Sequence, residues 1–307
     1  MPELPEVETV RRGLERLIVG RQITHVEVRD SPRSFPNATD DVEQFLIASA
    51  VKTVRRRAKV LLLDLTSNYT LVTHLKMTGQ LVFVAKNAHQ PIPNSQTPIP
   101  GEASLRFGAG HPNDSLVGKL PDRSTRVVLT FDDGSHLYFN DQRKFGWMKL
   151  YPSLEVSNID FMQRVGPEPL EDDFTATQFI PRMRRRNGTT VKAAILDQTV
   201  LAGVGNIYAD ESLWGATIHP ATRVRDVSDE QLGKLLTEIK FVMNLSIQKG
   251  GSTDRNYVDA EGKRGSYLEF ARVFRRENEA CPRCGTPIEK IRVAGRGTHF
   301  CPTCQVL

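Results

Sequence analysis

The chain has 307 residues, with 41 Lys and Arg against 36 Asp and Glu, which gives a formal charge of +5 and a pI of about 9.0. This length predicts two domains, and 39% hydrophobic with 25% charged residues excludes disordered and collagen-like proteins. The sequence contains no apolar run long enough for a membrane span and no secretory signal at its start. We therefore expect a cytoplasmic protein with no membrane partner.

The first predicted element is an amphipathic helix close to the amino terminus. Its apolar residues recur at three- and four-residue spacing, at Val7, Val10, Leu14 and Leu17. Pro5 suits the first turn of this helix, where a missing N–H group costs nothing.

Residues 22–150 change to short β-type runs, which predict a β-sandwich or barrel with attached helices. Asp132-Asp133-Gly134 is a hairpin turn signal between two of them. Within this region, 86–121 is rich in Pro, Gly, Asn and Ser, so we expect a surface insertion without regular structure. A tolerated loop and a functional lid both stay open for it. The runs are Ile23 to Val28, Val60 to Leu65, Thr70 to His74, Leu81 to Val84, Arg126 to Phe131 and His136 to Phe139.

Residues 151–175 contain two proline-rich turns and are interpreted as a linker. Beyond them the periodicity is helical, most clearly from Ser228 to Lys249, where Ser228 and Gln231 predict a capping box. The second half is therefore expected to be helical with a cysteine-bearing tail.

All four cysteines lie in the last 27 residues, in the pattern C-x2-C-x16-C-x2-C formed by Cys281, Cys284, Cys301 and Cys304. This spacing predicts a zinc ribbon that holds one structural Zn²⁺, with no open position for metal chemistry. A redox dithiol pair is the alternative. Arg296 is expected at the tip of the ribbon, either gripping a phosphate or simply solvated.

Basic residues are concentrated in three clusters, which fits a phosphate-contacting groove, although each cluster alone is more typical of a solvated surface. Gly203 and Gly205 precede a predicted helix beginning near Asn206, whose backbone N–H groups suit a phosphate. The clusters are Lys52 with Arg55, Arg56, Arg57 and Lys59; Arg143 with Lys144; and Arg182 with Arg184, Arg185, Arg186 and Lys192.

The segment from Met1 to Glu8 offers unusual chemistry. Removal of Met1 would leave Pro2 with a free secondary amine, which attacks an aldehyde-type carbon to give a cationic iminium. Glu3 and Glu6 would lie at the positive end of the first helix, where one of them is able to donate a proton. An ordinary helix start is the plain alternative.

Seven motifs, taken in chain order, make the sequence resemble the bacterial formamidopyrimidine-DNA glycosylase family, from residue 2 to residue 305. Leu4 favours this branch over the endonuclease VIII type. The motifs are Pro2 to Thr9, Arg57 to Lys59, His74 to Gly79, Asp141 to Gly146, Gly166 to Leu170, Gly203 to Ala209 and Gly295 to Cys304.

The resemblance implies an α+β multidomain fold. Residues 1–150 would form a catalytic β-sandwich domain flanked by helices, with the insertion 86–121, and 151–175 the linker. A helix-two-turns-helix DNA-binding domain would follow at 176–270 and a zinc ribbon at 271–307. Asp254 to Ser266 would be the loop that closes over the everted base.

The resemblance also implies a monomeric, bifunctional enzyme of base excision repair, located near the bacterial nucleoid. As a DNA glycosylase it would be a hydrolase that excises 8-oxoguanine and formamidopyrimidines from damaged double-stranded DNA. As an abasic-site lyase it would then nick the strand.

Residue by residue, Pro2 would be the nucleophile, Glu3 the acid and base, Lys59 the β-elimination residue and Arg296 the phosphate ligand that assists δ-elimination. Met77, Arg143 and Phe145 would form the wedge that fills the space of the flipped base. The plain alternatives are core positions for Met77 and Phe145 and a surface position for Arg143. Lys192 and Asn206 would contact the DNA backbone.

Some positions depart from the family pattern, among them Lys76, Ser124, Gln142, Lys144 and the stretch 271–276. None of them affects Pro2, Glu3 or Lys59, so they bear on lesion preference rather than on chemistry. Two rival hypotheses remain: a pyrimidine-lesion glycosylase on the same scaffold, and a non-catalytic zinc-ribbon DNA binder.

Overall fold

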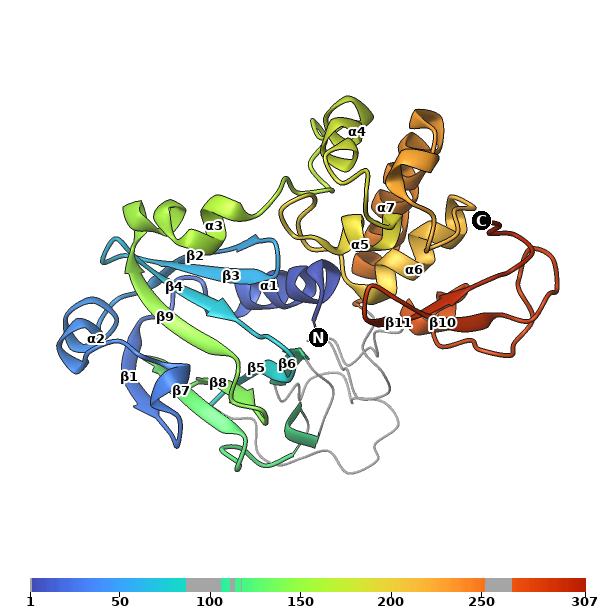
Figure 1. The fold of residues 1–307 in the computed structure, drawn as a ribbon. Coiled ribbons are helices and arrows are strands. Elements are labelled where there is room, and N and C mark those ends of the chain that lie inside the picture. The colour runs from blue at the N-terminus through green and yellow to red at the C-terminus, as the bar shows by residue number, and fades with distance from the viewer. Residues whose placement is uncertain (1, 87–105, 111–113, 117, 252–266) are drawn as a thin grey trace. The chain divides into compact units, whose positions relative to one another are not determined.

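The structure is a computed structural model that describes residues 2–86, 106–110, 114–116, 118–251 and 267–307. The chain divides into two compact units (Figure 1). The sandwich unit comprises Met1–Gln163 with Gly250–Ser266, and the helical–zinc unit comprises Arg164–Lys249 with Tyr267–Leu307. Each unit is described separately below.

Two antiparallel sheets form the sandwich unit, so of the sandwich and the barrel that the strand pattern left open, the structure has the sandwich that the family resemblance implies. The five-stranded sheet has the order β1 (Ile23–Val28), β7 (Thr125–Phe131), β8 (His136–Asp141), β5 (Gly79–Val84) and β6 (Arg106–Gly110). The four-stranded sheet has the order β2 (Val51–Arg57), β3 (Val60–Leu65), β4 (Tyr69–His74) and β9 (Trp147–Pro152).

Helix α1 (Leu4–Ile18) completes the core of this unit, which confirms the predicted amphipathic helix. Val7, Val10 and Leu14 are fully buried and pack in one cluster with apolar side chains of both sheets. Pro5 lies in the first turn as expected. The shorter helices are α2 (Thr39–Phe45), α3 (Asp160–Arg164) and the 3₁₀ turns Pro32–Ser34, Asp114–Leu116 and Ser153–Asn158.

Two chain connections pass from one sheet to the other at neighbouring places. Residues 75–78 lead from β4 to β5, and residues 142–146 lead from β8 to β9. Gly79 pairs with Asp141 in the five-stranded sheet, and His74 pairs with Trp147 in the four-stranded sheet. Because both ends of both connections are paired, the strand register places the two connections side by side.

Residues 86–121 differ from the prediction of an insertion without regular structure, which is wrong for part of this range. Arg106–Gly110 forms β6 and pairs with β5, and Asp114–Leu116 forms a 3₁₀ turn. Residues 87–105, 111–113 and 117 lie outside the described part of the chain, so a lid role for them stays a hypothesis.

The helical–zinc unit contains α4 (Ala176–Arg184), α5 (Val191–Leu196), α6 (Asn206–Gly215) and α7 (Asp229–Gln248), with 3₁₀ turns at Val224–Asp226 and Tyr267–Phe270. The predicted capping box of α7 is confirmed, because Ser228 accepts from the Gln231 N–H and Gln231 accepts in return. Seven consecutive residues of α6, Tyr208 to Trp214, are buried. Such all-round burial identifies α6 as the central helix of this unit.

The tail of this unit is a two-stranded hairpin, β10 (Glu289–Val293) and β11 (Arg296–Phe300). Ala294 and Gly295 both have positive φ, as a two-residue hairpin turn requires. Arg296 is therefore the first residue of β11 rather than the centre of the turn. The predicted boundaries of the four segments stay predictions.

In the described ranges, none of the helices is long and apolar enough to cross a membrane.

Candidate active site and nucleic-acid interface

The amino terminus of α1 presents two buried carboxyl groups. Glu3 is the N-cap residue and is 4% exposed, and Glu6 is 6% exposed. The two form a capping box, in which the Glu3 N–H donates to Glu6 Oε2 over 2.8 Å and the Glu3 side chain accepts from the Glu6 N–H. The capping box fixes Glu3 directly beside Pro2, which is also buried.

Lys59 lies in the turn between β2 and β3 and is 6% exposed. Ala58 has a φ of +51°, which turns the chain back immediately before it. The next residue, Val60, pairs with His74 of β4. Burial, followed by the positive charges of Lys76 and Lys59, lowers the pKa of His74 to about 3. Lys59 is therefore a buried amine beside a neutral imidazole.

The three side chains predicted to form the wedge lie on the two connections between the sheets. Met77 is on the β4–β5 connection, and Arg143 and Phe145 are on the β8–β9 connection. Phe145 is 55% exposed, and the Arg143 guanidinium lies over its ring at 4.9 Å. A ring that is more than half exposed and lies beside a cation is not part of a protein core. The core alternative is therefore wrong for Phe145.

Several residues of the basic clusters are held in ion pairs within their own unit. The Arg55 guanidinium donates hydrogen bonds to both carboxylate oxygens of Asp64. This hydrogen bonding, together with the negative charge of Asp64, raises the pKa of Arg55. Arg56 pairs with Glu8, and Arg184 pairs with Asp229. These arginines have acidic partners within their own unit, and the phosphate-contacting groove suggested by the three clusters together stays a prediction.

In the helical–zinc unit, the β10–β11 hairpin is fixed to α6 by polar contacts. Asn206, the first residue of α6, donates from Nδ2 to the Gly297 carbonyl over 3.0 Å. The buried Asp210 accepts from the His299 backbone N–H over 2.9 Å. These bonds hold Arg296, which is exposed, at the end of the hairpin next to the amino terminus of α6.

Lys192 is fully buried rather than exposed with the other basic residues. Its ammonium donates to Asp210 Oδ1 over 2.5 Å and to Thr298 Oγ1 over 2.7 Å. Its place in a basic run of the sequence predicts a surface position for Lys192, and the structure corrects that prediction. A contact between Lys192 and a phosphate stays a prediction.

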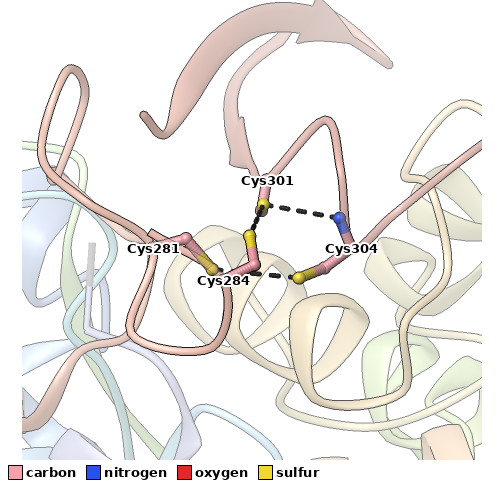
Figure 2. A group of neighbouring side chains, drawn as sticks. All are labelled: Cys281, Cys284, Cys301 and Cys304. Atoms are coloured by element: carbon pink, nitrogen blue, oxygen red, sulfur yellow. Dashed lines mark hydrogen bonds between the residues drawn. The ribbon is translucent and has the colours of Figure 1, made fainter. Parts of the chain in front are cut away.

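The four cysteines converge as the sequence predicts (Figure 2). Their sulfur atoms all lie within 4.8 Å of one another, with 4.0 Å between Cys281 and Cys304 and 3.5 Å between Cys284 and Cys301. Zinc–sulfur bonds of about 2.3 Å in a tetrahedron separate sulfurs by roughly 3.8 Å, whereas a disulfide requires about 2.05 Å. The donor set fits one structural Zn²⁺ and complete coordination by four thiolates.

Trp214 of α6 connects this metal site to the helical core. Its Nε1–H donates to Cys281 Sγ over 3.4 Å, and the Arg283 guanidinium lies over its ring at 4.0 Å. Arg272 lies 4.7 Å from the ring centroid. An N–H donor to a zinc-ligating sulfur offsets part of the negative charge that four thiolates bring together.

Comparison with protein families gives three matches along the chain. Residues 1–148 match the formamidopyrimidine-DNA glycosylase N-terminal domain, 165–257 the formamidopyrimidine-DNA glycosylase H2TH domain, and 278–306 the zinc finger found in FPG and IleRS. Together they define the class, a DNA-repair glycosylase with a helical DNA-binding domain and a zinc finger.

Full-length relatives then identify the family. The chain is 42% identical to formamidopyrimidine-DNA glycosylase of Herpetosiphon aurantiacus, over 99% of this chain and 100% of the relative. It is 39% identical to that of Pediococcus pentosaceus over the full length of both. The chain belongs to the formamidopyrimidine-DNA glycosylase family.

Solved structures agree with this assignment. A Lactococcus lactis FPG mutant in complex with DNA containing Fapy-dG has a TM-score of 0.82 and 31% identity, with both chains fully covered. The Lactococcus lactis Fpg complex with DNA containing an abasic site has a TM-score of 0.81 and 31% identity, over 99% of this chain and all of the other.

Several residues that organise the site could not be assigned a role from the sequence. His74, Thr78 and Asp141 lie inside the recognised motifs but received no role. Asp210 and Trp214 carry no local signal, because their partners are far away in the sequence. The loop predicted at Asp254 to Ser266 lies outside the described residues.

Proposed function

We propose that this protein removes oxidised purines, namely 8-oxoguanine and formamidopyrimidines, from damaged double-stranded DNA and then nicks the strand as an abasic-site lyase. Membership of the family supports this proposal, as do the DNA lesions bound by the Lactococcus lactis relatives. The protein would act as a single copy in the bacterial cytoplasm, at the nucleoid.

The observation that carries the proposal is the buried pair Pro2 and Glu3 at the amino terminus of α1. Once Met1 is removed, Pro2 is a secondary amine next to a carboxyl group. The positive end of the helix and the capping box fix that carboxyl group, so the nucleophile and the proton carrier are adjacent before any DNA binds.

The chemistry then follows from these two groups. The Pro2 nitrogen bonds to C1′ of the damaged nucleotide, the bond from C1′ to the base breaks, and the base leaves with that electron pair and a proton. Glu3 protonates the sugar ring oxygen as the ring opens, which leaves an iminium between C1′ and nitrogen.

The iminium withdraws electrons from the sugar, so a proton at C2′ becomes acidic. Its loss expels the 3′ phosphate in β-elimination, and a second proton loss expels the 5′ phosphate in δ-elimination. In each elimination one carbon loses a proton and its neighbour loses a phosphate, so the oxidation level of the sugar as a whole does not change and no external oxidant is needed. Lys59 would assist the first elimination, and Arg296 would bind the phosphate that leaves in the second.

Met77, Arg143 and Phe145 would occupy the space left by the everted nucleotide, with Arg143 facing the orphaned cytosine. Asn206 and the amino terminus of α6 would hold the DNA backbone next to Arg296. The zinc ion would supply no chemistry to the reaction, because four cysteines complete its coordination.

The test is borohydride reduction during incubation with duplex DNA that contains 8-oxoguanine, followed by mass analysis of the adducted peptide. We expect a covalent complex through the Pro2 nitrogen. The matched control is the same protein carrying a cleavable amino-terminal tag, which acylates Pro2 until the tag is removed directly before that residue.

Trapping by the cleaved protein alone supports the proposal. Full strand scission without a covalent complex, by a protein whose free terminus is confirmed as Pro2, contradicts it. Faster excision of an oxidised pyrimidine than of 8-oxoguanine across a panel of lesion duplexes would favour the sister activity instead.

A further inference from the structure

One buried carboxylate joins the two connections that carry the predicted wedge. Asp141 is the last residue of β8 and is 1% exposed. On the β4–β5 side, its Oδ1 accepts a hydrogen bond from the Thr78 hydroxyl, and Thr78 directly follows Met77. The carboxylate therefore reaches across from one connection to the other.

The same carboxylate organises its own connection. The Arg143 N–H donates to Asp141 Oδ1 over 3.2 Å and to Thr78 Oγ1 over 3.1 Å. The Gly146 N–H donates to Asp141 Oδ2 over 2.6 Å. These bonds close a tight turn around Arg143 and Phe145, with Lys144 at a φ of +58°.

The turn also depends on the absence of a side chain at Gly146. A Cβ atom there would lie 2.7 Å from the Phe139 ring and 3.1 Å from both Asp141 Oδ2 and the His74 carbonyl. The backbone of the β8–β9 connection is thus pressed against the carboxylate and against β4 together. The Gly146 N–H therefore cannot move away from Asp141 unless the close packing of Gly146 on Phe139 and His74 opens.

We propose that Asp141, with Thr78, is the positioning residue of the wedge. It locks both connections into a single arrangement, so that Met77, Arg143 and Phe145 enter the duplex together. This inference rests on the proposed function, because it assigns the three side chains their role in base eversion. Asp141 touches no reacting atom, and it acts through the backbone that it holds.

The proposal predicts a defect in eversion rather than in bond chemistry. The first variant is Thr78→Val, which removes the hydroxyl at constant shape. The second is Asp141→Asn, which replaces one carboxylate oxygen by an NH₂ group that cannot accept a hydrogen bond from a backbone N–H. Thr78→Ser restores the hydroxyl. Thr70→Val is the matched control, because buried Thr70 donates to Asp64 Oδ1 over 2.8 Å at the opposite end of β4.

Wedge insertion is measured by stopped flow with a fluorescent cytosine analogue opposite the lesion. We expect the rate of wedge insertion to be at least about tenfold lower in Thr78→Val and Asp141→Asn than in wild type, because each variant loses a charge-assisted hydrogen bond. Thr78→Ser and Thr70→Val should insert at the wild-type rate. Borohydride trapping at an abasic site in single-stranded DNA, which has no opposite base, should stay within about twofold in all four.

Wild-type insertion rates in both Thr78→Val and Asp141→Asn overturn the proposal, as does an equal loss in Thr70→Val or a trapping defect as large as the insertion defect.

Hydrogen exchange in the DNA-free protein tests the lock without any substrate. The Arg143 and Gly146 amides should exchange faster in Asp141→Asn but not in Thr70→Val, and unchanged exchange overturns the lock. Failure of the wild type to excise the lesion would instead overturn the proposed function.

Discussion

In the sandwich unit, Pro2 and Glu3 lie directly before a helix whose apolar face is buried against two sheets. In the helical–zinc unit, Arg296 lies on a two-stranded hairpin with few apolar side chains beneath it. A two-stranded hairpin is marginal in water by itself. The hairpin is therefore stabilised by four metal-binding thiolates and by the buried contacts of Asp210, whereas α1 is stabilised by a large apolar core.

The two regions therefore differ in how strongly a single substitution destabilises them. Apolar packing is spread over many contacts, so no single substitution in the sandwich core removes the support of α1. Metal ligation and a buried ion pair are concentrated in a few atoms, and the loss of one partner leaves the others without compensation. The predictions below test this contrast.

The largest expected effect follows from loss of the metal. Cys281→Ser removes one of four thiolates, and structural zinc contributes about 10–16 kcal/mol to the folding of zinc-finger peptides. We expect the variant to lose bound zinc, to unfold the hairpin and to bind DNA about 10- to 100-fold more weakly through loss of the Arg296 contact. Metal analysis and DNA titration measure both effects.

Hydrogen exchange of α1 and the β-strands serves as the control, because the sandwich unit should be unaffected by this change. Undiminished DNA binding by a zinc-free variant would contradict the support that we assign to the metal.

The next effect is on catalysis at the capping box. Glu3→Gln keeps an oxygen that accepts the helix N–H but removes the transferable proton, so folding should be maintained. Base excision should fall by about 10²- to 10⁴-fold, the usual contribution of a general acid or base. Single-turnover excision of 8-oxoguanine measures this loss.

Glu6→Gln is the matched variant, since Gln is also able to accept from the Glu3 N–H. We expect it to lose much less activity. Equal losses in the two variants would show that the whole box, and not Glu3 alone, carries the proton.

A smaller but sizeable effect is expected on stability in the helical–zinc unit. Asp210→Asn removes the charge that pairs with the fully buried Lys192 ammonium, and breaking such a buried pair costs about 3–5 kcal/mol. Urea unfolding measures the loss. Glu230→Gln breaks the exposed pair with Lys234 and should cost less than about 0.5 kcal/mol. Similar losses in both variants would remove the contrast between buried and exposed pairs.

The smallest expected effect concerns pH and His74. Burial lowers the pKa of His74 to about 3 in the folded protein, against 6.5 in the unfolded chain. Between these values the unfolded chain binds the extra proton, so stability falls as the pH falls below 6.5, by up to about 1.4 kcal/mol per pH unit. His74→Gln should lose less stability than wild type between pH 7 and pH 4.5. Parallel pH curves of unfolding free energy would exclude this role for His74.

Periodicity and spacing predict α1, α7, the β-rich first half and the metal ligands, because each of these depends on residues close together in the chain, but they leave a sandwich and a barrel open. Strand β2 was read as a basic cluster, since its outward positions carry Arg55 and Arg57. Strand β6 lies in a segment rich in proline and glycine, for which the sequence predicts no regular structure. Strand β6 forms through pairing with β5, which ends at Val84, and a local pattern does not contain that partner. Strand β2 pairs with the adjacent β3 through Arg57 and Val60, so its hairpin lies within the local pattern.

The candidate site divides in the same way. The motifs located Pro2, Glu3, Lys59, the wedge residues and Arg296, whose roles stay predictions. They did not distinguish the buried Lys192 from its exposed neighbours, because burial of its ammonium depends on Asp210 and Thr298, which lie 18 and 106 residues away. Asp141 and Trp214 were missed for the same reason.

The chain has two tryptophans, and each unit contains one of them. Trp147 lies beside His74 in the sandwich. Trp214 donates to a zinc-ligating sulfur, and two guanidinium groups lie over its ring. The emission of Trp214 should therefore follow metal occupancy, while that of Trp147 follows the sheets. The protein carries its own pair of optical reporters, with which loading of the metal and integrity of the sandwich unit are monitored in a single cuvette.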